Sequence, residues 1–380
     1  MKLNSILAAV ICLITLSCRD KDLGVKTAQK YCTNCHALPL PADLDKESWG
    51  LVLDSMGTFI GIPSQNKSRP LFRAAANTVI PKRTITDSEW QALSDYFISG
   101  AHQDEQPPKE NAKMCNVSFQ KTEIRIDSPV QAITWVELDA ACNCLRFAEG
   151  IQGDLFEADL KGKIRKKIHV GYSVTGSVEI HGKKYFVAAK NLLPNDDPSG
   201  ILFTLNGQTP KILRNDLIRP VYITSFTDNN KVPFLIISEF GHTQGRLSKI
   251  NLTNYERTTL SDLSGYISSL INGKGELLAL RAQADEAIVQ FAPNIKNLIR
   301  FSPSWGSTSI AWTTFDAQNK EYLVTSHGDN GDLPDMPYKP AHGIRVYENI
   351  DNNWAQKYFY PMPGAYKVMT GKFFEKQKTD

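Results

Sequence analysis

The chain has 380 residues, of which 42% are hydrophobic and 22% are charged. This is the composition of an ordinary folded protein rather than a disordered one, and the length suggests more than one domain. The 43 basic and 40 acidic side chains leave a formal net charge of +3. Because proteins that bind phosphate backbones carry a large basic excess, we expect no nucleic-acid partner.

Residues 1–18 have the pattern of an export signal. Lys2 precedes an apolar run over residues 6–14, which is too short to span a bilayer. The segment resembles a bacterial lipoprotein signal peptide, although that family prefers other residues where Thr15 and Leu16 stand. The resemblance implies that Cys18 is lipidated and becomes the first residue of the mature protein. Ordinary secretion, with Cys18 unmodified or removed, is the alternative. Both interpretations predict an exported protein, located in the periplasm, at the outer membrane or on the cell surface. Lipidation of Cys18 would in addition anchor it to a membrane.

Residues 31–36, YCTNCH, form the motif with the most specific chemistry. Cys32 and Cys35 are separated by two residues, and His36 follows directly. Two cysteines at this spacing can each form a thioether bond to a haem vinyl group, and the adjacent imidazole can then bind the iron. A redox dithiol or half of a zinc site is the alternative, but no second pair of ligands follows at zinc spacing. The motif therefore predicts one covalently bound haem c, with His36 as the proximal iron ligand.

Residues 22–103 show the pattern of a small helical domain around this motif. Helices are expected over residues 23–35 and 45–55, and a third should begin at a capping box over residues 86–89 and end near Gly100. A haem motif followed by a connecting helix and a closing helix resembles a class I cytochrome c domain. The resemblance implies a small all-α fold.

In that family a methionine sulfur usually fills the sixth position of the iron. Met56 lies between His36 and the closing helix, and the loop at residues 79–83, where family members often carry the ligand, contains no sulfur. We therefore expect Met56 to be the distal ligand. The alternatives are that Met56 is a core residue, or that His102 is the ligand.

A polar, proline-bearing linker is expected at residues 104–116, and beyond it the pattern changes to short β-type runs. Five similar runs recur at intervals of roughly 40 to 50 residues, and each is followed by a polar loop and a second run. They begin at Leu145, Tyr185, Phe234, Leu277 and Tyr322. Short strands at this period favour radially packed four-stranded blades over a sandwich, so residues 117–380 predict an all-β propeller.

Residues 223–250 and 300–374 resemble the FG-GAP/VCBS β-propeller repeats that are fused to cytochrome c domains in exported bacterial proteins. The resemblance implies a multidomain fold, in which a small all-α cytochrome c domain precedes a propeller of five recognisable blades and the start of a sixth. Blades of that family often hold Ca²⁺ in an acidic hairpin. The stretches at residues 227–233 and 315–321 have too few carboxylates for this, so we expect ordinary hairpins without Ca²⁺.

Residues 365–373 are expected to be the first strand of that sixth blade, and the sequence stops at Asp380. A propeller closes by pairing its last blade with its first, so an incomplete blade leaves an exposed strand edge. The sequence therefore looks truncated relative to its family. We expect a tendency to aggregate or to be cleaved near the C-terminus.

The loops that follow the five similar strands should open on one face of the propeller, near its axis. They bring charged groups from five blades together, which predicts a polar funnel for a small molecule or for side chains of a protein partner. A solvated rim of ordinary hairpin loops is the alternative. The funnel residues are Glu149, Lys190, Asn191, Glu239, His242, Arg281, His327, Asp329 and Asp332.

Three cysteines lie outside the signal and the haem motif. In a compartment that permits disulfides, Cys115 can pair with Cys142 or Cys144. Residues 142 and 144 would point to the same face of a strand, so we expect that they do not pair with each other. Three unpaired thiols are the alternative.

These patterns together predict an exported, lipid-anchored monohaem cytochrome. It would carry out one-electron transfer with redox partner proteins and use the propeller as a docking or binding domain. The alternative is a haem-fused oxidoreductase whose propeller oxidises a small substrate and passes electrons to the haem. A surface adhesion module is a third hypothesis, which the complete haem motif disfavours. An electron carrier is preferred to an enzyme, since no set of nucleophile, base and acid is evident.

Overall fold

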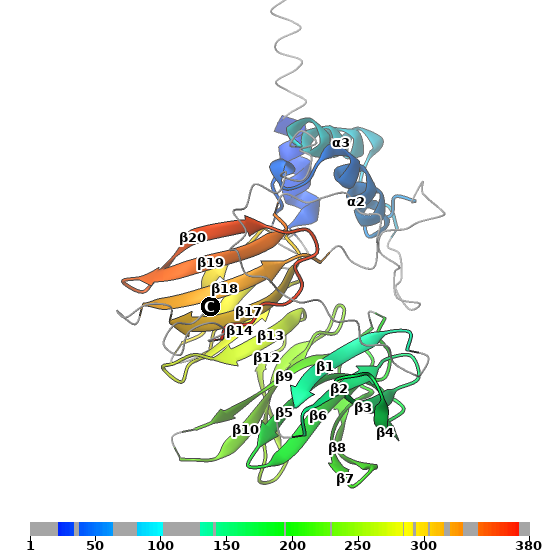
Figure 1. Ribbon diagram of the computed structural model, residues 1–380. Helices are drawn as coiled ribbons and strands as arrows, with labels where there is room; N and C mark the ends of the chain where they lie inside the picture. The colour runs from blue at the N-terminus through cyan, green and yellow to red at the C-terminus, as the bar shows by residue number, and fades with distance from the viewer. Residues whose placement is uncertain are drawn as a thin grey trace, which may run out of the picture.

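The computed structural model describes residues 22–33, 38–63, 82–101, 130–139, 142–193, 195–228, 230–283, 285–291, 294–302, 305–314, 320–329 and 341–371. Most of the secondary structure in these residues is β (Figure 1). Within these residues, twenty strands form five four-stranded antiparallel sheets, and in each sheet the strands lie side by side in chain order. Each sheet is therefore a simple meander.

We number the sheets 1 to 5 along the chain. Sheet 1 contains β1 (Ile133–Asp139), β2 (Cys144–Glu149), β3 (Asp154–Asp159) and β4 (Ile164–His169). Sheet 2 contains β5 (Ser173–Ile180), β6 (Lys183–Ala189), β7 (Gly200–Asn206) and β8 (Thr209–Leu217). Sheet 3 contains β9 (Pro220–Thr227), β10 (Pro233–Glu239), β11 (Arg246–Asn251) and β12 (Arg257–Ser261). Sheet 4 contains β13 (Tyr266–Ile271), β14 (Leu277–Arg281), β15 (Ala287–Gln290) and β16 (Lys296–Arg300). Sheet 5 contains β17 (Ser307–Thr314), β18 (Glu321–His327), β19 (Gly343–Ile350) and β20 (Asn353–Pro361).

The five runs that the sequence marked as similar strands are the second strands of the five sheets: β2, β6, β10, β14 and β18. Their side chains are buried almost without interruption, as the pattern of Leu277–Arg281 illustrates. A strand with neighbours on both edges and sheets packed on both faces needs such continuous apolar runs. This burial explains why the repeat was visible in the sequence.

Four hydrophobic clusters fill the spaces between consecutive sheets. Ala148 and Leu155 of sheet 1 pack with Phe186 of sheet 2, and equivalent clusters join sheets 2 and 3, 3 and 4, and 4 and 5. Burial of apolar surface at about 25 cal/mol per Å² is the main stabilising contribution at such contacts. This arrangement, in which each meander packs face to face on the next, is consistent with a β-propeller.

The first strands of the sheets are joined by a repeated hydrogen bond. The hydroxyl of Thr134 in β1 donates to the carbonyl of Val174 in β5 at 2.7 Å, and Thr175 in β5 donates to Pro220 in β9 at 2.8 Å. Each threonine lies at the β-bulge of its strand, where the extra residue is turned out of the ladder. The bulge thus frees a hydroxyl to connect neighbouring sheets.

The segment after β20 is joined to β17 by the same kind of threonine hydrogen bond, but it does not form a strand. Thr308 in β17 donates to the carbonyl of Ala365 at 3.1 Å, and Thr370 donates to the carbonyl of Trp312 at 3.3 Å. Ala365 and Val368 are buried. Residues 365–371 therefore run beside β17, but no strand occurs among the described residues after β20, so the expected first strand of a sixth blade is wrong.

The helical segment comprises residues 22–32, η1 (Pro41–Asp43), α2 (Lys46–Thr58) and α3 (Asp87–Gly100). Ala28, Trp49 and Phe97 lie in its one hydrophobic cluster among the described residues. Figure 1 shows these helices beyond the ends of the strands, next to sheet 5. The hydroxyl of Ser302, in the loop between β16 and β17, donates to the carboxylate of Asp43 and so joins this segment to the sheets.

The expected fold class is wrong. The described chain is mostly β, with five small antiparallel sheets, and its few helices do not form a distinct all-α cytochrome c domain. The amphipathic patterns located helices at residues 46–58 and 87–100. A helical period identifies an element, however, and does not specify the fold that the element joins. The linker expected at residues 104–116 lies outside the described residues.

The capping box that begins α3 is confirmed. The hydroxyl of Thr86 accepts from the backbone amide of Glu89 at 3.2 Å, and the Glu89 carboxylate accepts from the Thr86 amide at 3.0 Å. Lys30 donates to the same carboxylate at 3.0 Å. These contacts lower the pKa of Glu89 to about 2, the bond from the Thr86 amide contributing most.

We expect Glu89→Ala to destabilise α3 by about 1 kcal/mol at neutral pH, because the helix loses a cap and its contact to Lys30. A carboxylate whose pKa is depressed on folding stabilises the folded state above its unfolded pKa. This contribution is therefore present above about pH 4.5 and is lost as the pH falls towards 2. Amide hydrogen exchange in α3 at pH 7 and near pH 3 measures the difference. Glu47→Ala, an exposed acid in the first turn of α2, is the control; an equal loss at both pH values would contradict the explanation.

Candidate haem site and the polar ends of the sheets

The helix over residues 22–32 ends at Cys32, the first cysteine of the YCTNCH motif. Cys32 is half-buried and packs against the cluster that contains Trp49 and Phe97. Tyr31 donates its hydroxyl to the carbonyl of Thr84 at 3.0 Å, which ties this helix end to the residues before α3. Cys35, His36, Cys18 and His102 lie outside the described residues, so their predicted roles stay predictions.

Helix α2 presents Met56 on its buried side. Asp45 caps the helix by accepting from the amide of Ser48 at 2.7 Å, and the indole of Trp49 donates to the carbonyl of Pro41 at 2.7 Å. Met56 follows Trp49 by seven residues and the buried Leu53 by three, so all three share one face of the helix. Met56 itself is half-buried. The spacing therefore places the thioether of Met56 near the face of α2 that carries Trp49 and Leu53.

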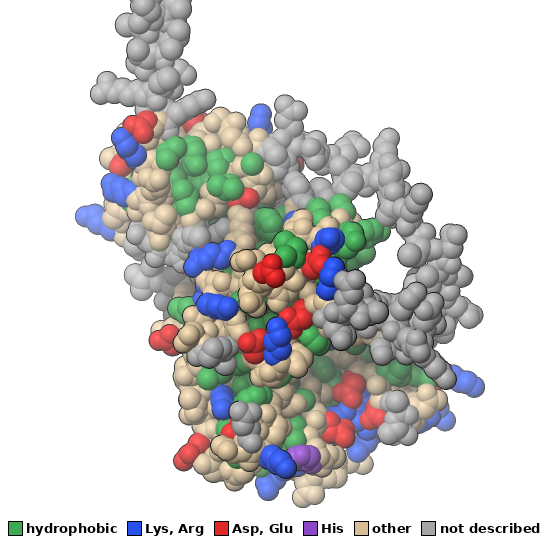
Figure 2. Space-filling model, turned by 90° about the vertical axis from the view of Figure 1, so that its left-hand side faces the viewer, with side chains coloured by type: hydrophobic (Ala, Val, Ile, Leu, Met, Phe, Trp, Pro, Cys, Tyr) green, Lys and Arg blue, Asp and Glu red, His purple; other side chains and the backbone are tan. Residues whose placement is uncertain are grey.

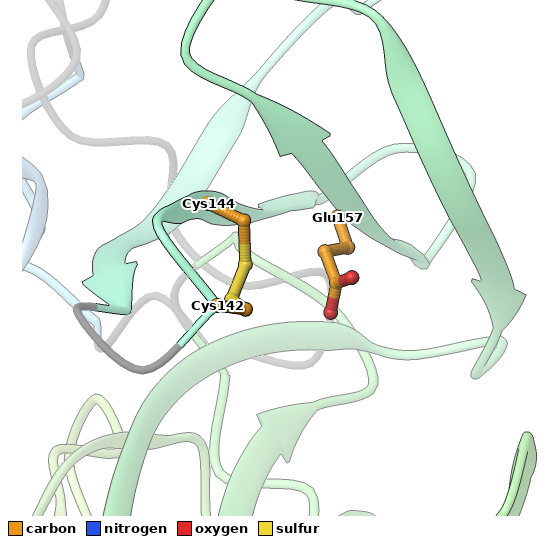
Figure 3. A group of neighbouring side chains, drawn as sticks. All are labelled: Cys142, Cys144 and Glu157. Carbon is orange, nitrogen blue, oxygen red and sulfur yellow. A yellow bond between two sulfur atoms is a disulfide. The ribbon is translucent and has the colours of Figure 1, made fainter.

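The cysteines of sheet 1 contradict the expected pairing. Cys142 and Cys144 form a disulfide with each other, with a Cα–Cα distance of 5.2 Å (Figure 3). The expectation was wrong because it placed both residues on a strand, whereas β2 begins at Cys144 and Cys142 lies in the preceding turn. Asn143 between them has a positive φ of 47°, which turns the two side chains towards each other. Cys115 lies outside the described residues.

The predicted funnel residues divide into two groups. Glu149, Glu239, Arg281 and His327 are almost completely buried and form hydrogen bonds within the loops and strands. Lys190, Asn191 and Asp329 are exposed, His242 is half-buried, and Asp332 lies outside the described residues. Because these buried side chains already use their polar atoms in hydrogen bonds within the fold, the structure does not bring the predicted set together as an open binding site.

Glu239 illustrates the role of the buried charges. Its carboxylate accepts from the backbone amide of Ile218 at 2.6 Å, from Nε of Arg246 at 2.8 Å and from the hydroxyl of Ser248. These donors come from the entry to β9 and from β11, so one side chain at the end of β10 joins three parts of sheet 3. Three hydrogen bonds compensate for burying the carboxylate of Glu239. Without this carboxylate, these donors, above all the guanidinium of Arg246, would lose their hydrogen-bond acceptor at a large cost in free energy.

We expect Glu239→Ala to lower the free energy of unfolding by about 3–5 kcal/mol, because it leaves the guanidinium of Arg246 without its carboxylate. Denaturant unfolding of the full chain measures this loss. Glu179→Ala, which removes an exposed glutamate from β5, should change the free energy of unfolding by less than about 0.5 kcal/mol. Equal, small effects of both substitutions would show that Glu239 is not a structural link.

His327 lies at the equivalent end of β18 and is fully buried. Ser307 donates to Glu286 at 2.6 Å and lies 3.1 Å from Nδ1 of His327, while Thr325 lies 2.8 Å from Nε2. Burial, and secondarily the charges of Arg345 and His342, lower the pKa of His327 well below its usual value. The imidazole is therefore neutral at pH 7, donates from Nδ1 to Ser307 and accepts from Thr325.

The sequence did not indicate two further polar residues at these loops. Asp196, between β6 and β7, accepts from the backbone amides of His242, Thr243 and Gln244 and so joins sheet 2 to sheet 3. Burial raises the pKa of Asp196, but these hydrogen bonds outweigh it and leave the pKa below the usual value. Glu286 accepts from the amide of Ser307 at 2.9 Å and joins sheet 4 to sheet 5. Both residues lie in loops that follow second strands, β6 and β14, but farther along these loops than the residues that were predicted there.

The hairpin between β9 and β10 has the expected ordinary geometry. Asp228 accepts from the amides of Asn230 and Val232 at 3.0 and 2.8 Å, and Thr227 pairs with Pro233 across the turn. The carboxylate therefore stabilises the turn itself. Most of the second stretch, residues 315–319, lies outside the described residues.

Comparisons with known proteins do not give a family. No family model and no curated protein matches the chain. Similar solved structures include a protein from Lactobacillus plantarum, with a TM-score of 0.43, 8% identity and coverage of 63% of this chain and 74% of that one. A luciferin-regenerating enzyme has a TM-score of 0.42, 13% identity and coverage of 65% and 84%. A putative 6-phosphogluconolactonase from Bacteroides uniformis has a TM-score of 0.39, 13% identity and coverage of 60% and 71%.

Likenesses this weak carry no argument about activity. The expected membership of a family that fuses a class I-like cytochrome c domain to an FG-GAP/VCBS propeller is wrong, because no family model matches and the described chain is nearly all β. Short segments such as residues 223–250 resembled those repeats because alternating strands and polar hairpins are shared by many β-rich folds.

Proposed function

We propose that this protein binds one haem c covalently and transfers electrons one at a time. The observation that carries the proposal is the sequence of residues 32–36, in which two thiols and an imidazole have the spacing of haem c attachment. Cys32 and Cys35 would form the two thioethers, and His36 would bind the iron. Bound haem supplies a one-electron iron couple whose potential depends on the axial ligands and the surrounding polarity.

The surroundings of Cys32 fit a large apolar group. Cys32 lies against the cluster of Leu53, Leu93 and Phe97, and α2 contributes Leu53 and the half-buried Met56 to this side of the segment. Two thiols, an imidazole and a thioether are the donor set of a haem with histidine and methionine ligands, which has a higher potential than a haem with two histidines. In this proposal the apolar cluster excludes water, and Met56 raises the potential.

The sheets would serve as a β-propeller scaffold that docks redox partner proteins. On the face shown in Figure 2, acidic and basic side chains are interspersed over the sheets, while hydrophobic side chains gather on the helical segment. An apolar patch with a charged surround is typical of short-lived contacts between redox proteins. We therefore place the electron-transfer contact at the helical segment.

The alternative function, oxidation of a small substrate by the sheets, has less support. The predicted funnel residues Glu149, Glu239 and Arg281 are used in hydrogen bonds that hold the sheets together. A catalytic acid or base must be able to reach its substrate. None of these three residues lines the cavity between sheets 1 and 2 or the cavity beside Lys274 and Glu321.

Export and lipidation at Cys18 complete the proposal, because haem c is attached outside the cytoplasmic membrane in bacteria. None of the helices within the described ranges is both long enough and apolar enough to cross a membrane. Radiolabelled palmitate incorporation into the full chain, and its loss in Cys18→Ala, tests the anchor.

Anaerobic reduction of the haem distinguishes the two functions. An electron carrier should remain oxidised with small substrates alone, and should exchange electrons rapidly with a second c-type cytochrome. Reduction by a sugar or alcohol without an added partner would favour the oxidoreductase instead. Absence of haem from the exported chain would contradict both.

A further inference from the structure

We propose that Cys142 and Cys144 form a redox-active disulfide that exchanges with external dithiols. The two cysteines are separated by one residue and are bonded to each other at the start of β2. Figure 3 shows the bond beside Glu157, whose side chain extends from the neighbouring strand β3 towards the sulfurs. The proposal concerns sheet 1 and is independent of haem binding.

The bond adds little to the stability of the fold. A disulfide stabilises mainly by restricting the unfolded chain, and this effect grows with the length of the loop that it closes. Here the loop contains a single residue, Asn143. The hairpin already holds the same backbone, because Cys144 pairs with Asp139 across β1 and with Asp159 across β3. Reduction should therefore leave the sheet intact, as a reversible redox site requires.

The two sulfurs differ in their access to solvent. Cys142 lies in the turn and is half-buried, whereas Cys144 lies in the strand and is completely buried. An incoming thiolate can reach the sulfur of Cys142 only. Cys144 is therefore the leaving group of the exchange.

The environment of Cys144 contains a cation that favours a leaving thiolate. Arg146, two residues along the same face of β2, forms ion pairs with Asp139 at 2.5 Å and with Glu157 at 3.3 Å. Asp139 is the cross-strand partner of Cys144, so the guanidinium extends past the Cys144 side chain. The sulfurs and one carboxylate oxygen of Glu157 lie within 4.8 Å of one another. The two charges act in opposite directions: Arg146 favours the thiolate, and Glu157 disfavours it.

A cavity lies next to the charged neighbours of the disulfide, although neither cysteine is part of its lining. It has a volume of about 280 Å³ between sheets 1 and 2, and both Arg146 and Glu157 line it. Lys166, Lys183 and Lys184 also line it, so cations outnumber the acid. A positive lining attracts thiolates over neutral thiols. The site thus fits a small dithiol, or the exposed cysteine pair of a thiol oxidoreductase.

The dithiol supplies the electrons and protons that the exchange requires. One thiolate of the dithiol attacks the sulfur of Cys142, the bond between the two protein sulfurs breaks, and its electron pair remains on Cys144. The second thiol of the dithiol, after losing its proton, attacks its partner sulfur in the mixed disulfide and releases Cys142. The dithiol loses two electrons and two protons as its own disulfide forms, and Cys142 and Cys144 gain them.

The test uses the full exported chain carrying Cys115→Ser, so that the third thiol cannot exchange with the pair. Dithiothreitol is the probe, and mass spectrometry counts alkylated thiols at Cys142 and Cys144 over time without denaturant. We expect both thiols to appear in the folded protein, and the midpoint of denaturant unfolding to stay unchanged after reduction. Reduction that occurs only with unfolding would overturn the proposal, as would isolation of the exported protein without the bond.

Two charge variants test the chemistry of the site. Arg146→Gln should slow the exchange a few-fold, because it raises the pKa of the leaving thiol, and Glu157→Gln should speed it by a similar factor. Arg165→Gln, which removes an exposed cation from β4, is the matched control and should have no effect. Changes of the same sign in both variants, or no change in either, would show that the neighbouring charges do not control the disulfide.

Discussion

Replacing both Cys32 and Cys35 by serine should abolish covalent haem attachment. Serine hydroxyls do not add to haem vinyl groups under the conditions that form thioethers, so neither bond can form. Haem should then be absent from the protein on a denaturing gel, where the wild-type chain stains for haem. The effect is expected to be complete, because the thioethers are the covalent connections that survive unfolding.

The matched control is Cys115→Ser, which removes a cysteine that lies outside the motif and should leave haem staining unchanged. His36→Ala should retain some covalent haem but lose the absorption spectrum of a haem with a strong axial nitrogen ligand. Haem staining in the double serine variant would contradict the assignment of the attachment site.

Replacement of Met56 by alanine should lower the reduction potential of the haem by on the order of 100 mV, a fraction of the approximately 0.8 V range that axial ligands span. A thioether stabilises ferrous iron relative to a nitrogen or oxygen ligand, so its loss favours the ferric state. The same change should remove the weak far-red band that accompanies methionine ligation. Spectroelectrochemical titration measures both effects in one experiment.

Met369→Ala is the control for this experiment, since Met369 is 74% exposed and lies in the segment beyond β20. It should leave the potential and the band unchanged. If Met56→Ala also leaves both unchanged, Met56 is only a core residue on the buried face of α2, and the distal ligand is another group.

The strand pattern was the part of the fold most accessible from the sequence. The second strand of each sheet has neighbours on both edges and is covered on both faces, so Leu235 and Leu278, for example, belong to uninterrupted apolar runs. Runs of this kind recur visibly along the chain. The outer strands, such as β4 with Lys166 and Lys167, are half-exposed and carry no comparable signal.

The sequence predicted the positions of the helices but not the way in which they pack. The Thr86–Glu89 capping box is a local interaction, and a sequence motif is sufficient to predict it. Which fold the helices form depends on contacts between distant residues, such as that of Asp43 with Ser302, and these have no local signature. The resemblance to a cytochrome c domain relied on the haem motif and on the helices that follow it, and neither specifies how those helices pack.

The arrangement of the polar side chains at the ends of the sheets could not be predicted. The sequence shows which loop residues are polar, but it does not show whether their side chains point to solvent or to the interior. Glu239 and His327 were identified as loop charges, yet both turn inwards, are buried and form hydrogen bonds with residues of neighbouring strands. Similarly, the disulfide depends on the positive φ of Asn143, which lets two cysteines in neighbouring positions meet. Asparagine tolerates this conformation better than most residues, and this was the one signal available.

The mass of the full chain, exported by a bacterium that attaches haem c, tests the central claim most directly. We expect a protein that is heavier than its polypeptide and lipid by the mass of one haem, with one iron per chain, and that keeps this mass after denaturation. A mass equal to that of the polypeptide with or without lipid, and no iron, would contradict the account.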